Sequence, residues 1–253
     1  MKGLTKILSA AVLLLGFVAV PNAHALTLVD LELSLLVDVS GSIDTTEFNL
    51  QKNGYASAFT NASIINAIIA GTGVHHSIAV NLVYWSGNAQ QSQVVGWTLI
   101  NDATSSIAFA NAINATTQLF SGNTAPGSAI NFDVPLFGTN LYEGDKKIID
   151  VSGDGEQNDG ANTATARNNA AAAGFTINGL AIGNTSLVAW YTANIKTTDG
   201  FVLQASTFND FGTAVNQKIL QEVTPGPVIP EPATMLLMGS GLFGTVFLRR
   251  KQA

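Results

Sequence analysis

The sequence contains no cysteine among its 253 residues. Disulfide bonds, thiolate metal sites and cysteine nucleophiles are therefore all excluded. A folded protein of this kind has to rely on its hydrophobic core, on bound ions, or on both. Histidine is also scarce, with three in the whole chain, of which His75 and His76 are adjacent.

Basic residues are few as well, with 11 Lys and Arg against 17 Asp and Glu and a net charge of −6. Five of the basic residues and Glu231 lie near the two ends of the chain. The central part, residues 26–223, keeps six Lys and Arg against sixteen Asp and Glu, a net charge of −10. Such an acidic domain repels nucleic acid and anionic membrane surfaces, so no nucleic-acid partner is expected.

Residues 1–25 have the three-part pattern of a secretory leader. Lys2 and Lys6 give a positive start, Ile7–Val20 is an apolar stretch, and Ala23–Ala25 (AHA) offers small residues before a cleavage point. The pattern predicts a signal peptide that a signal peptidase cleaves after the last of these residues. A retained membrane anchor is the alternative, but the apolar run is shorter than the roughly 20 residues that span a bilayer.

The other end of the chain is equally distinctive. Residues 224–229 (TPGPVI) form a Pro- and Gly-rich linker in which a helix cannot persist. Residues 230–253 then contain Pro230–Pro232 (PEP), the apolar stretch Met235–Leu248 and the basic cluster Arg249–Lys251. A short apolar stretch followed by positive charge suits a segment that pauses in the inner membrane with its basic end inside.

This order of features resembles the PEP-CTERM sorting signal of Gram-negative bacteria. The resemblance implies processing by an exosortase and export to the outer surface or the extracellular matrix, often in biofilm-forming species. A permanently anchored inner-membrane protein is the alternative.

Residues 26–223 are expected to form one α/β domain, because this length can bury a sizeable core and because strand and helix patterns alternate. The expected strands are 31–37, 76–85, 91–97, 147–151, 176–182 and 201–204. The expected helices are 45–60, 102–115, 126–137, 162–173, 186–195 and 208–223. The second and third strands are expected to form a hairpin at the sheet edge. The pattern predicts a doubly wound, Rossmann-like fold with a mostly parallel central sheet and helices on both faces.

Residues 31–42 (LELSLLVDVSGS) are the most informative segment. An apolar run without polar alternation suits a parallel strand that is covered on both faces. The run ends at Asp38, and Ser40 and Ser42 follow at alternate positions. Since ligands of open α/β sheets bind beyond the carboxyl ends of the strands, these three side chains are expected at a binding edge.

Two further oxygen-bearing residues are expected at the same edge. Thr124 lies in the loop before the helix that starts at residue 126, and Asp154 lies in the Gly-Asp-Gly turn after the strand 147–151. Two carboxylates and three hydroxyls are hard ligands that suit Mg²⁺, Mn²⁺ or Ca²⁺ and leave one position of an octahedral ion open. Three glycines are expected to let the backbone approach the ion: Gly41, Gly153 and Gly155.

The set of Asp38, Ser40, Ser42, Thr124 and Asp154 resembles the metal-ion-dependent adhesion site of von Willebrand factor type A domains. Four segments resemble an uncharacterised bacterial family of such domains: VDLELSLLVDVSGSID, VVGWTLINDA, DVSGDGEQNDG and FTINGLAIG. The resemblance implies that the five residues bind one ion and that an acidic residue of a protein partner completes the coordination. In some members the last helix moves on binding.

Other interpretations stay open. Asp and Ser after a strand are also ordinary turn and cap residues, and a domain of this fold can lose its ion. Asp150 either orients Ser40 or Ser42 or makes a structural hydrogen bond. A serine nucleophile would need a base, but His75 and His76 lie at the start of the second strand, away from this edge, and no G-x-S-x-G motif is present.

The sequence therefore predicts an exported, non-enzymatic module that binds a carboxylate-bearing protein or matrix ligand through a divalent cation. The expected location is the cell surface, outer membrane or extracellular space, after transient retention in the inner membrane. One alternative is a structural matrix protein whose metal site is incidental or lost. A metal-dependent hydrolase is the other, because an open Mg²⁺ can polarise a phosphoryl oxygen.

Overall fold

The computed structural model describes residues 25–224. The predicted tail, nearly all of the predicted linker and the leader except its last residue lie outside this range. The strands are β1 (Thr27–Val29), β2 (Leu31–Asp38), β3 (Ile78–Trp85), β4 (Gln91–Ile100), β5 (Tyr142–Gly144), β6 (Lys147–Gly153), β7 (Thr176–Ile182) and β8 (Val202–Ala205). The helices are α1 (Thr45–Ala58), α2 (Ala62–Ile69), α3 (Ala103–Asn114), α4 (Pro126–Asp133), α5 (Thr163–Ala172), α6 (Thr185–Asn194), α7 (Phe208–Val223) and the 3₁₀ helix η1 (Val134–Gly138).

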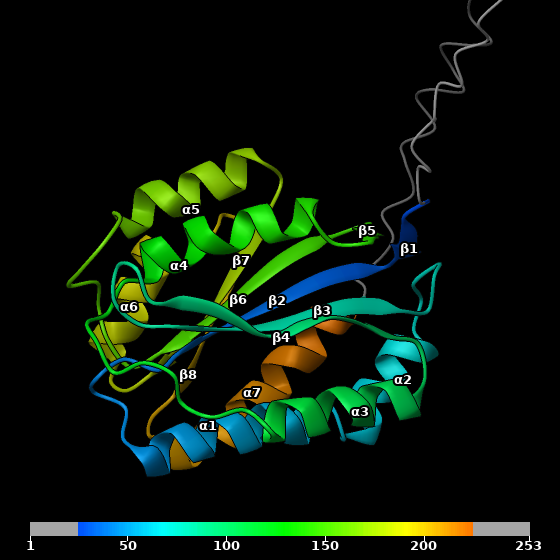
Figure 1. Ribbon diagram of the computed structural model, residues 1–253, viewed down its shortest axis with the longest axis horizontal. Coiled ribbons are helices and arrows are strands. Elements are labelled where there is room, and N and C mark those ends of the chain that lie inside the picture. Colours follow the sequence, from blue (N-terminus) through cyan, green and yellow to red (C-terminus); the bar gives the residue numbers. More distant parts are fainter. Residues whose placement is uncertain (1–24, 225–253) are drawn as a thin grey trace, which may run out of the picture.

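The central sheet has six strands in the order β4-β3-β2-β6-β7-β8 (Figure 1). All neighbouring pairs are parallel except β3 and β4, which are antiparallel. The predicted hairpin at the sheet edge and the mostly parallel sheet are therefore confirmed. A parallel sheet needs crossover helices between its strands, and these helices end up on its two faces.

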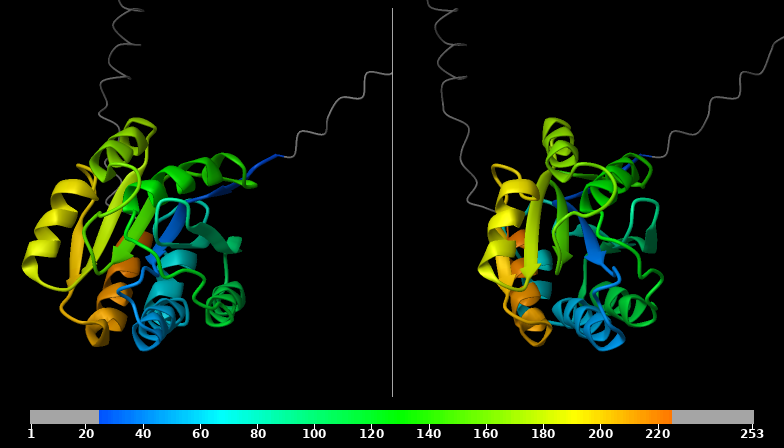
Figure 2. Two further views of the ribbon diagram at one scale, coloured as in Figure 1. Left: turned by 60° about the vertical axis from the view of Figure 1, so that its left-hand side comes forward. Right: turned by 90° about the vertical axis from the view of Figure 1, so that its left-hand side faces the viewer.

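The helices form two layers around the sheet. In Figure 1, α4 and α5 lie above the sheet, and α1, α2, α3 and α7 lie below it. The two additional views in Figure 2 show the same separation. Glu32 and Ser34 interrupt the apolar sequence of β2, yet all of its side chains are buried. Leu33 and Leu35 belong to the core below the sheet, and Leu36 belongs to the core above it. Successive side chains of a strand point to opposite faces, so a strand covered on both sides needs apolar residues at both.

Two helices show how local sequence decides the element boundaries. The predicted capping box of α1 is present, since the Asp44 carboxylate accepts the amide hydrogen of Glu47 at 2.9 Å and the Glu47 carboxylate accepts that of Asp44 at 3.0 Å. The helix predicted over residues 126–137 is divided into α4 and η1. Pro135 lies at this division, where a residue without an amide hydrogen cannot continue the α-helical hydrogen-bond pattern.

Three elements were absent from the sequence prediction. Helix α2 is rich in isoleucine, which has a modest helix propensity, and it is stabilised because Ile64, Ile65 and Ile68 are buried. Strands β1 and β5 have three residues each and form a small separate parallel pair. Within residues 25–224, none of the helices has the length and apolar character needed to cross a membrane.

The sheet register brings the predicted site residues together. Strands β2 and β6 are parallel neighbours in which Val37 pairs with Ser152. The residues that follow, Asp38 on one strand and Asp154 beyond the other, therefore emerge side by side at the carboxyl edge. This edge faces the viewer in the right-hand view of Figure 2.

Candidate metal centre

Asp38 lies at the innermost point of the site. It is the last residue of β2, it pairs with Trp85 of β3, and its side chain is completely buried. One carboxylate oxygen, Oδ1, accepts the amide hydrogen of Ser40 at 2.8 Å. The other, Oδ2, has no hydrogen-bond partner among the described residues. A buried carboxylate oxygen without a partner is costly, and such atoms in proteins call for an explanation such as an ion or a water molecule.

Ser40, Ser42 and Asp154 form a chain of polar contacts beside Asp38. The hydroxyl oxygens of Ser40 and Ser42 are 3.2 Å apart. The Ser42 hydroxyl donates a hydrogen bond to Oδ1 of Asp154 at 2.8 Å. Ser40 is buried and Ser42 is exposed, so the group of oxygens runs from the protein interior to the surface.

Thr124 comes from a third loop, which is tied to the other two. The amide of Gly41 donates to the carbonyl of Gly122 at 2.7 Å. The amide of Thr124 donates to the side-chain carbonyl of Asn158 at 2.8 Å, and its carbonyl accepts the amide hydrogen of Asn158 at 3.0 Å. These bonds hold the loop against both the segment after β2 and the segment after β6.

The Thr124 side chain is less closely engaged than the other four. It is buried and lies next to Gly155, where a Cβ atom would be 3.5 Å from the threonine hydroxyl oxygen. Within residues 25–224, its hydroxyl makes no hydrogen bond with the four other predicted ligands. The structure therefore brings the three loops together, with four side chains in one cluster and Thr124 at its border.

The electrostatics of the cluster favour a cation. Burial, reinforced by the charge of Asp154, raises the pKa of Asp38 to about 8. Burial also raises the pKa of Asp154 above its usual value. None of the described Lys or Arg side chains forms an ion pair with either carboxylate. Two neighbouring acids without a positive partner, one with an unpaired buried oxygen, fit a divalent cation bound by hard oxygen ligands.

Two of the three glycines that were expected to let the backbone approach the ion lie against protein atoms of the site. A Cβ atom at Gly153 would lie 2.6 Å from Oδ2 of Asp38 and 2.8 Å from the Tyr191 hydroxyl oxygen. A Cβ atom at Gly41 would lie 2.8 Å from the carbonyl oxygen of Ser121. Both glycines therefore make room for protein atoms of the site.

Tyr191 was missed in the sequence analysis. It lies in α6, its ring is buried, and its hydroxyl has no hydrogen-bond partner among the described residues. Burial is the main reason why the pKa of this tyrosine lies well above its ordinary value, and the negative charge of Asp38 raises it further. The sequence offers no local signal for this residue, because only the tertiary fold brings α6 next to the end of β2.

The suggestion that Asp150 orients Ser40 or Ser42 is wrong. Its carboxylate pairs with the Lys218 ammonium group of α7 at 2.6 Å, and both side chains are fully buried. Asp150 therefore links the sheet to the last helix. The histidines lie where they were expected: His75 contacts Asp30, just before the amino end of β2, at the far end of the strand from Asp38.

Two protein-family models match this chain. Residues 28–227 match a family described as "Protein of unknown function (DUF1194)". Residues 228–251 match the PEP-CTERM protein-sorting motif. No curated protein matches the chain at a significant level.

Several solved structures are similar to this one. Proximal thread matrix protein 1 from the mussel byssus matches with 18% identity and a TM-score of 0.59. The match covers 77% of this chain and 48% of that one, so this chain spans about half the length of the mussel protein. A second structure of that protein, with a zinc-occupied MIDAS motif, matches with 16% identity and a TM-score of 0.56 over 77% of this chain and 48% of that one.

Two bacterial proteins are similar to the same extent. The pilus adhesin SpaC from Lactobacillus rhamnosus GG has 14% identity and a TM-score of 0.58, covering 78% of this chain and 30% of that one. A von Willebrand factor type A protein from Catenulispora acidiphila has 16% identity and a TM-score of 0.54, covering 78% and 42%. At such low identities the likeness shows the fold alone. The chain therefore belongs to the DUF1194 family, has the fold of a von Willebrand factor type A domain, and carries a PEP-CTERM sorting motif.

Proposed function

We propose that this protein is an adhesion or ligand-binding module of the cell surface or extracellular matrix that binds its ligand through a divalent cation. The PEP-CTERM motif indicates export and a surface or extracellular location. The observation that carries the proposal is the buried carboxylate of Asp38, which has an unpartnered oxygen beside a second acid, Asp154. A cation between them would relieve both the desolvation and the repulsion.

Five residues would hold the ion. Ser40, Ser42 and Thr124 supply hydroxyl oxygens, and Asp38 and Asp154 supply carboxylate oxygens, bound directly or through water. Mg²⁺ is the ion that we propose, with Mn²⁺ or Ca²⁺ as substitutes that accept the same ligands. When bound, the ion offers an electrophilic position to an incoming carboxylate. The two aspartates balance its charge, so the partner does not have to neutralise it.

The surface next to the site offers room for a partner. A groove of about 510 Å³ is bordered by Asp154 and by the first turns of α1 and α7. Asp44 and Glu47 give it acidic walls, and Leu50 and Phe208 give it apolar ones. A partner segment with one carboxylate for the ion and basic or apolar neighbours is complementary to this groove. Such a ligand comes from a protein or a matrix component. During export, an exosortase and a signal peptidase act on the chain itself.

The first test is metal-dependent stabilisation. Adding Mg²⁺ or Mn²⁺ should raise the melting temperature, because a ligand at 100 times its Kd stabilises the folded state by about 2.7 kcal/mol. The variant Asp38→Ala should lose this response. Its matched control is Glu156→Gln, which removes an exposed acid two residues after Asp154. The control should respond as the wild type does, and an equal response of Asp38→Ala would contradict the proposal.

The second test separates adhesion from its alternatives. Capture of a partner from the native cell surface should require Mg²⁺ and should disappear when a chelator is added. A structural matrix protein with an incidental ion predicts capture that chelation leaves unchanged. This alternative has some support, since one protein of similar fold is a byssal thread matrix protein. A metal-dependent hydrolase predicts turnover of phosphate or ester substrates in a broad screen.

A further inference from the structure

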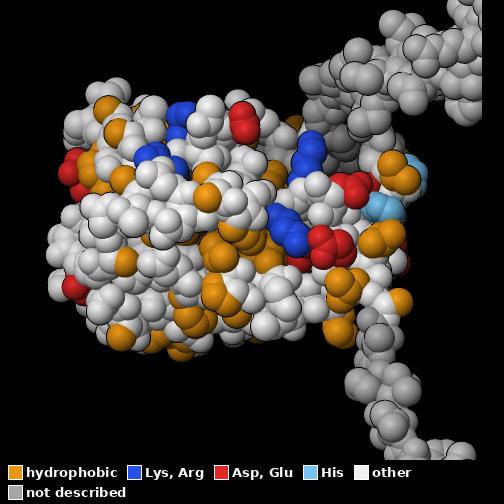
Figure 3. Space-filling view, turned by 90° about the horizontal axis from the view of Figure 1, so that it is seen from above, with side chains coloured by type: hydrophobic (Ala, Val, Ile, Leu, Met, Phe, Trp, Pro, Cys, Tyr) orange, Lys and Arg blue, Asp and Glu red, His pale blue; other side chains and the backbone are white. Residues whose placement is uncertain are grey.

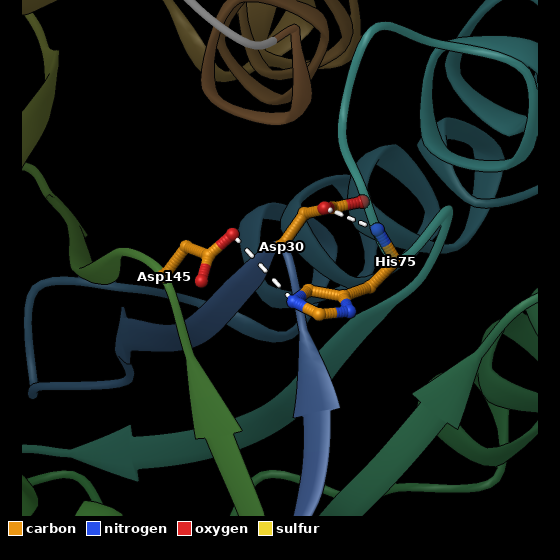
Figure 4. A group of neighbouring side chains, drawn as sticks. All are labelled: Asp30, His75 and Asp145. Atoms are coloured by element: carbon orange, nitrogen blue, oxygen red, sulfur yellow. Dashed lines mark hydrogen bonds and ion pairs between the residues drawn. The ribbon is translucent and has the colours of Figure 1, made fainter. Parts of the chain in front are cut away.

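A second group of metal-binding residues lies at the opposite end of β2. Asp30, His75 and Asp145 each offer one ligand atom, and these atoms all lie within 4.8 Å of one another (Figure 4). The three residues come from the junction of β1 and β2, from the loop before β3, and from the turn between β5 and β6. Strand β2 has eight residues, so the group is about 25 Å from Asp38 and independent of the first site.

Asp30 is held in a fixed orientation. Its Oδ1 accepts the amide hydrogen of His75 at 2.8 Å, and its Oδ2 accepts that of Ser77 at 3.3 Å. Each carboxylate oxygen keeps a further lone pair. A Cβ atom at Gly73 would clash with this carboxylate, so the loop needs a glycine there to accommodate it. Backbone hydrogen bonds that orient a carboxylate are a usual second layer of metal sites.

The backbones of Asp30 and Asp145 are anchored as well. The amide of Asp30 donates to the carbonyl of Ser77, and the amide of Asp145 donates to the carbonyl of Val29, at 2.9 and 3.0 Å. Nε2 of His75 lies 3.7 Å from Oδ2 of Asp145. Ligands of a tetrahedral zinc ion with bonds of about 2.0–2.1 Å are about 3.3 Å apart, so this pair needs only a small contraction. The Asp145 side chain is 60% exposed, so it can move toward His75 by this amount.

The group is open to solvent and to metal ions. Figure 3 shows pale blue histidine side chains close to red acidic side chains at one end of the molecule. The His75 side chain is 23% exposed. Two lysines follow Asp145 in the sequence, and Lys147 pairs with Glu32 and Glu143. Among the described residues, neither Lys146 nor Lys147 forms an ion pair with Asp30 or Asp145.

We propose that Asp30, His75 and Asp145 form a binding site for a transition-metal ion such as Zn²⁺. One imidazole nitrogen and two carboxylate oxygens suit Zn²⁺, Co²⁺ or Ni²⁺ better than Mg²⁺, which favours an all-oxygen environment. Water or an external ligand takes the fourth position. The ion joins three chain segments at the amino end of β2, and so fastens β1 and β5 to the main sheet.

The test uses the full chain in the Asp38→Ala background with excess Mg²⁺, so that the first site does not contribute. Zn²⁺ binding is measured by calorimetry, and Co²⁺ is used as a spectroscopic probe whose visible absorption reports nitrogen ligation. We expect one Zn²⁺ per chain. His75→Ala and Asp145→Asn should each weaken binding by at least about tenfold, because even the loss of an outer-layer partner has this effect.

The matched control is His76→Asn. This residue adjoins His75, is exposed, and has a φ of +51°, which asparagine tolerates. The control should bind Zn²⁺ as the parent does. Absence of Zn²⁺ binding, or binding that neither His75→Ala nor Asp145→Asn weakens, would overturn the proposal and leave only an ion pair between His75 and Asp145. Either result leaves the Mg²⁺ proposal untouched, because that site is tested in the wild-type chain.

Discussion

At the scale of single residues, the buried acids are the most informative feature of this protein. Asp38, Asp133 and Asp150 are each fully buried, which is rare for aspartate unless the carboxylate has a partner. Asp150 has an ammonium partner in Lys218. Asp38 lacks one, and the proposed cation would take that place. Asp133 has only a hydroxyl partner, Ser34, whose Oγ donates to Oδ1 at 2.6 Å.

The stability of the protein should therefore depend on pH through Asp133. Burial raises its pKa from 3.8 to about 7, so the folded state keeps a proton that the unfolded state has already lost. The free energy of unfolding should fall as the pH rises, by on the order of 4 kcal/mol between about pH 4 and pH 7 from this group. The stabilisation from Asp133 is thus complete at pH values below its pKa in the unfolded chain. It is lost as the pH rises through its pKa in the folded protein.

The variant Asp133→Asn tests this prediction, because it keeps an acceptor for Ser34 and removes the titration. Urea unfolding at about pH 5 and about pH 8 should show a smaller pH dependence for the variant, and greater stability than the wild type at the higher pH. Comparing the two proteins cancels the contributions of the other buried acids. Equal pH dependence of wild type and variant would show that Asp133 does not hold its proton in the folded protein.

At the scale of elements, α7 is attached to the sheet by an ion-pair network in the core. The Lys218 ammonium group lies 2.6 Å from both Asp150 of β6 and Glu222 of the same helix. The Asn178 side chain of β7 donates to Glu222 at 2.8 Å. Burial raises the pKa of Glu222 to about 7, although Lys218 acts in the opposite direction. The network thus joins the last helix to the strand that leads to Asp154.

Removing the lysine should be strongly destabilising. Lys218→Met leaves two buried carboxylates without a counter-charge, and breaking a buried pair in this way costs about 3–5 kcal/mol. Thermal and urea unfolding measure the loss. The control Lys146→Met alters an exposed lysine and should change stability by about 0.5 kcal/mol or less. Replacing all three charged groups by neutral residues should restore much of the stability, because no unpaired charge is then left in the core.

At the scale of the whole molecule, the acid excess of the domain should influence cation binding. Residues 26–223 carry a net charge of −10. Such a field attracts divalent cations, and dissolved salt screens it with a Debye length of about 10 Å at 0.1 M. Calorimetry should therefore show Mg²⁺ affinity weakening severalfold as NaCl is raised from low to high concentration. An affinity independent of salt would mean that the ligands alone, and not the field of the domain, determine binding.

Much of the fold could be predicted from sequence because its signals are local. The apolar run of β2, the capping box of α1 and the short loop between β3 and β4 each identify an element within a few residues. The alternation of strands and helices then leaves few topologies. Helix α2 and the pair β1–β5 were missed, since they are short and are stabilised by contacts with distant parts of the chain.

For the candidate site, the sequence by itself determined which residue types stand at the ends of the strands, and so the chemistry available there. Only the tertiary structure decided which of those side chains meet. It joined Ser42 to Asp154, left Thr124 at the border, and directed Asp150 to Lys218. It also assembled Asp30, His75 and Asp145 at the other edge. The physical reason is that ligand groups are defined by distances between segments far apart along the chain, and those distances follow from sheet register and packing.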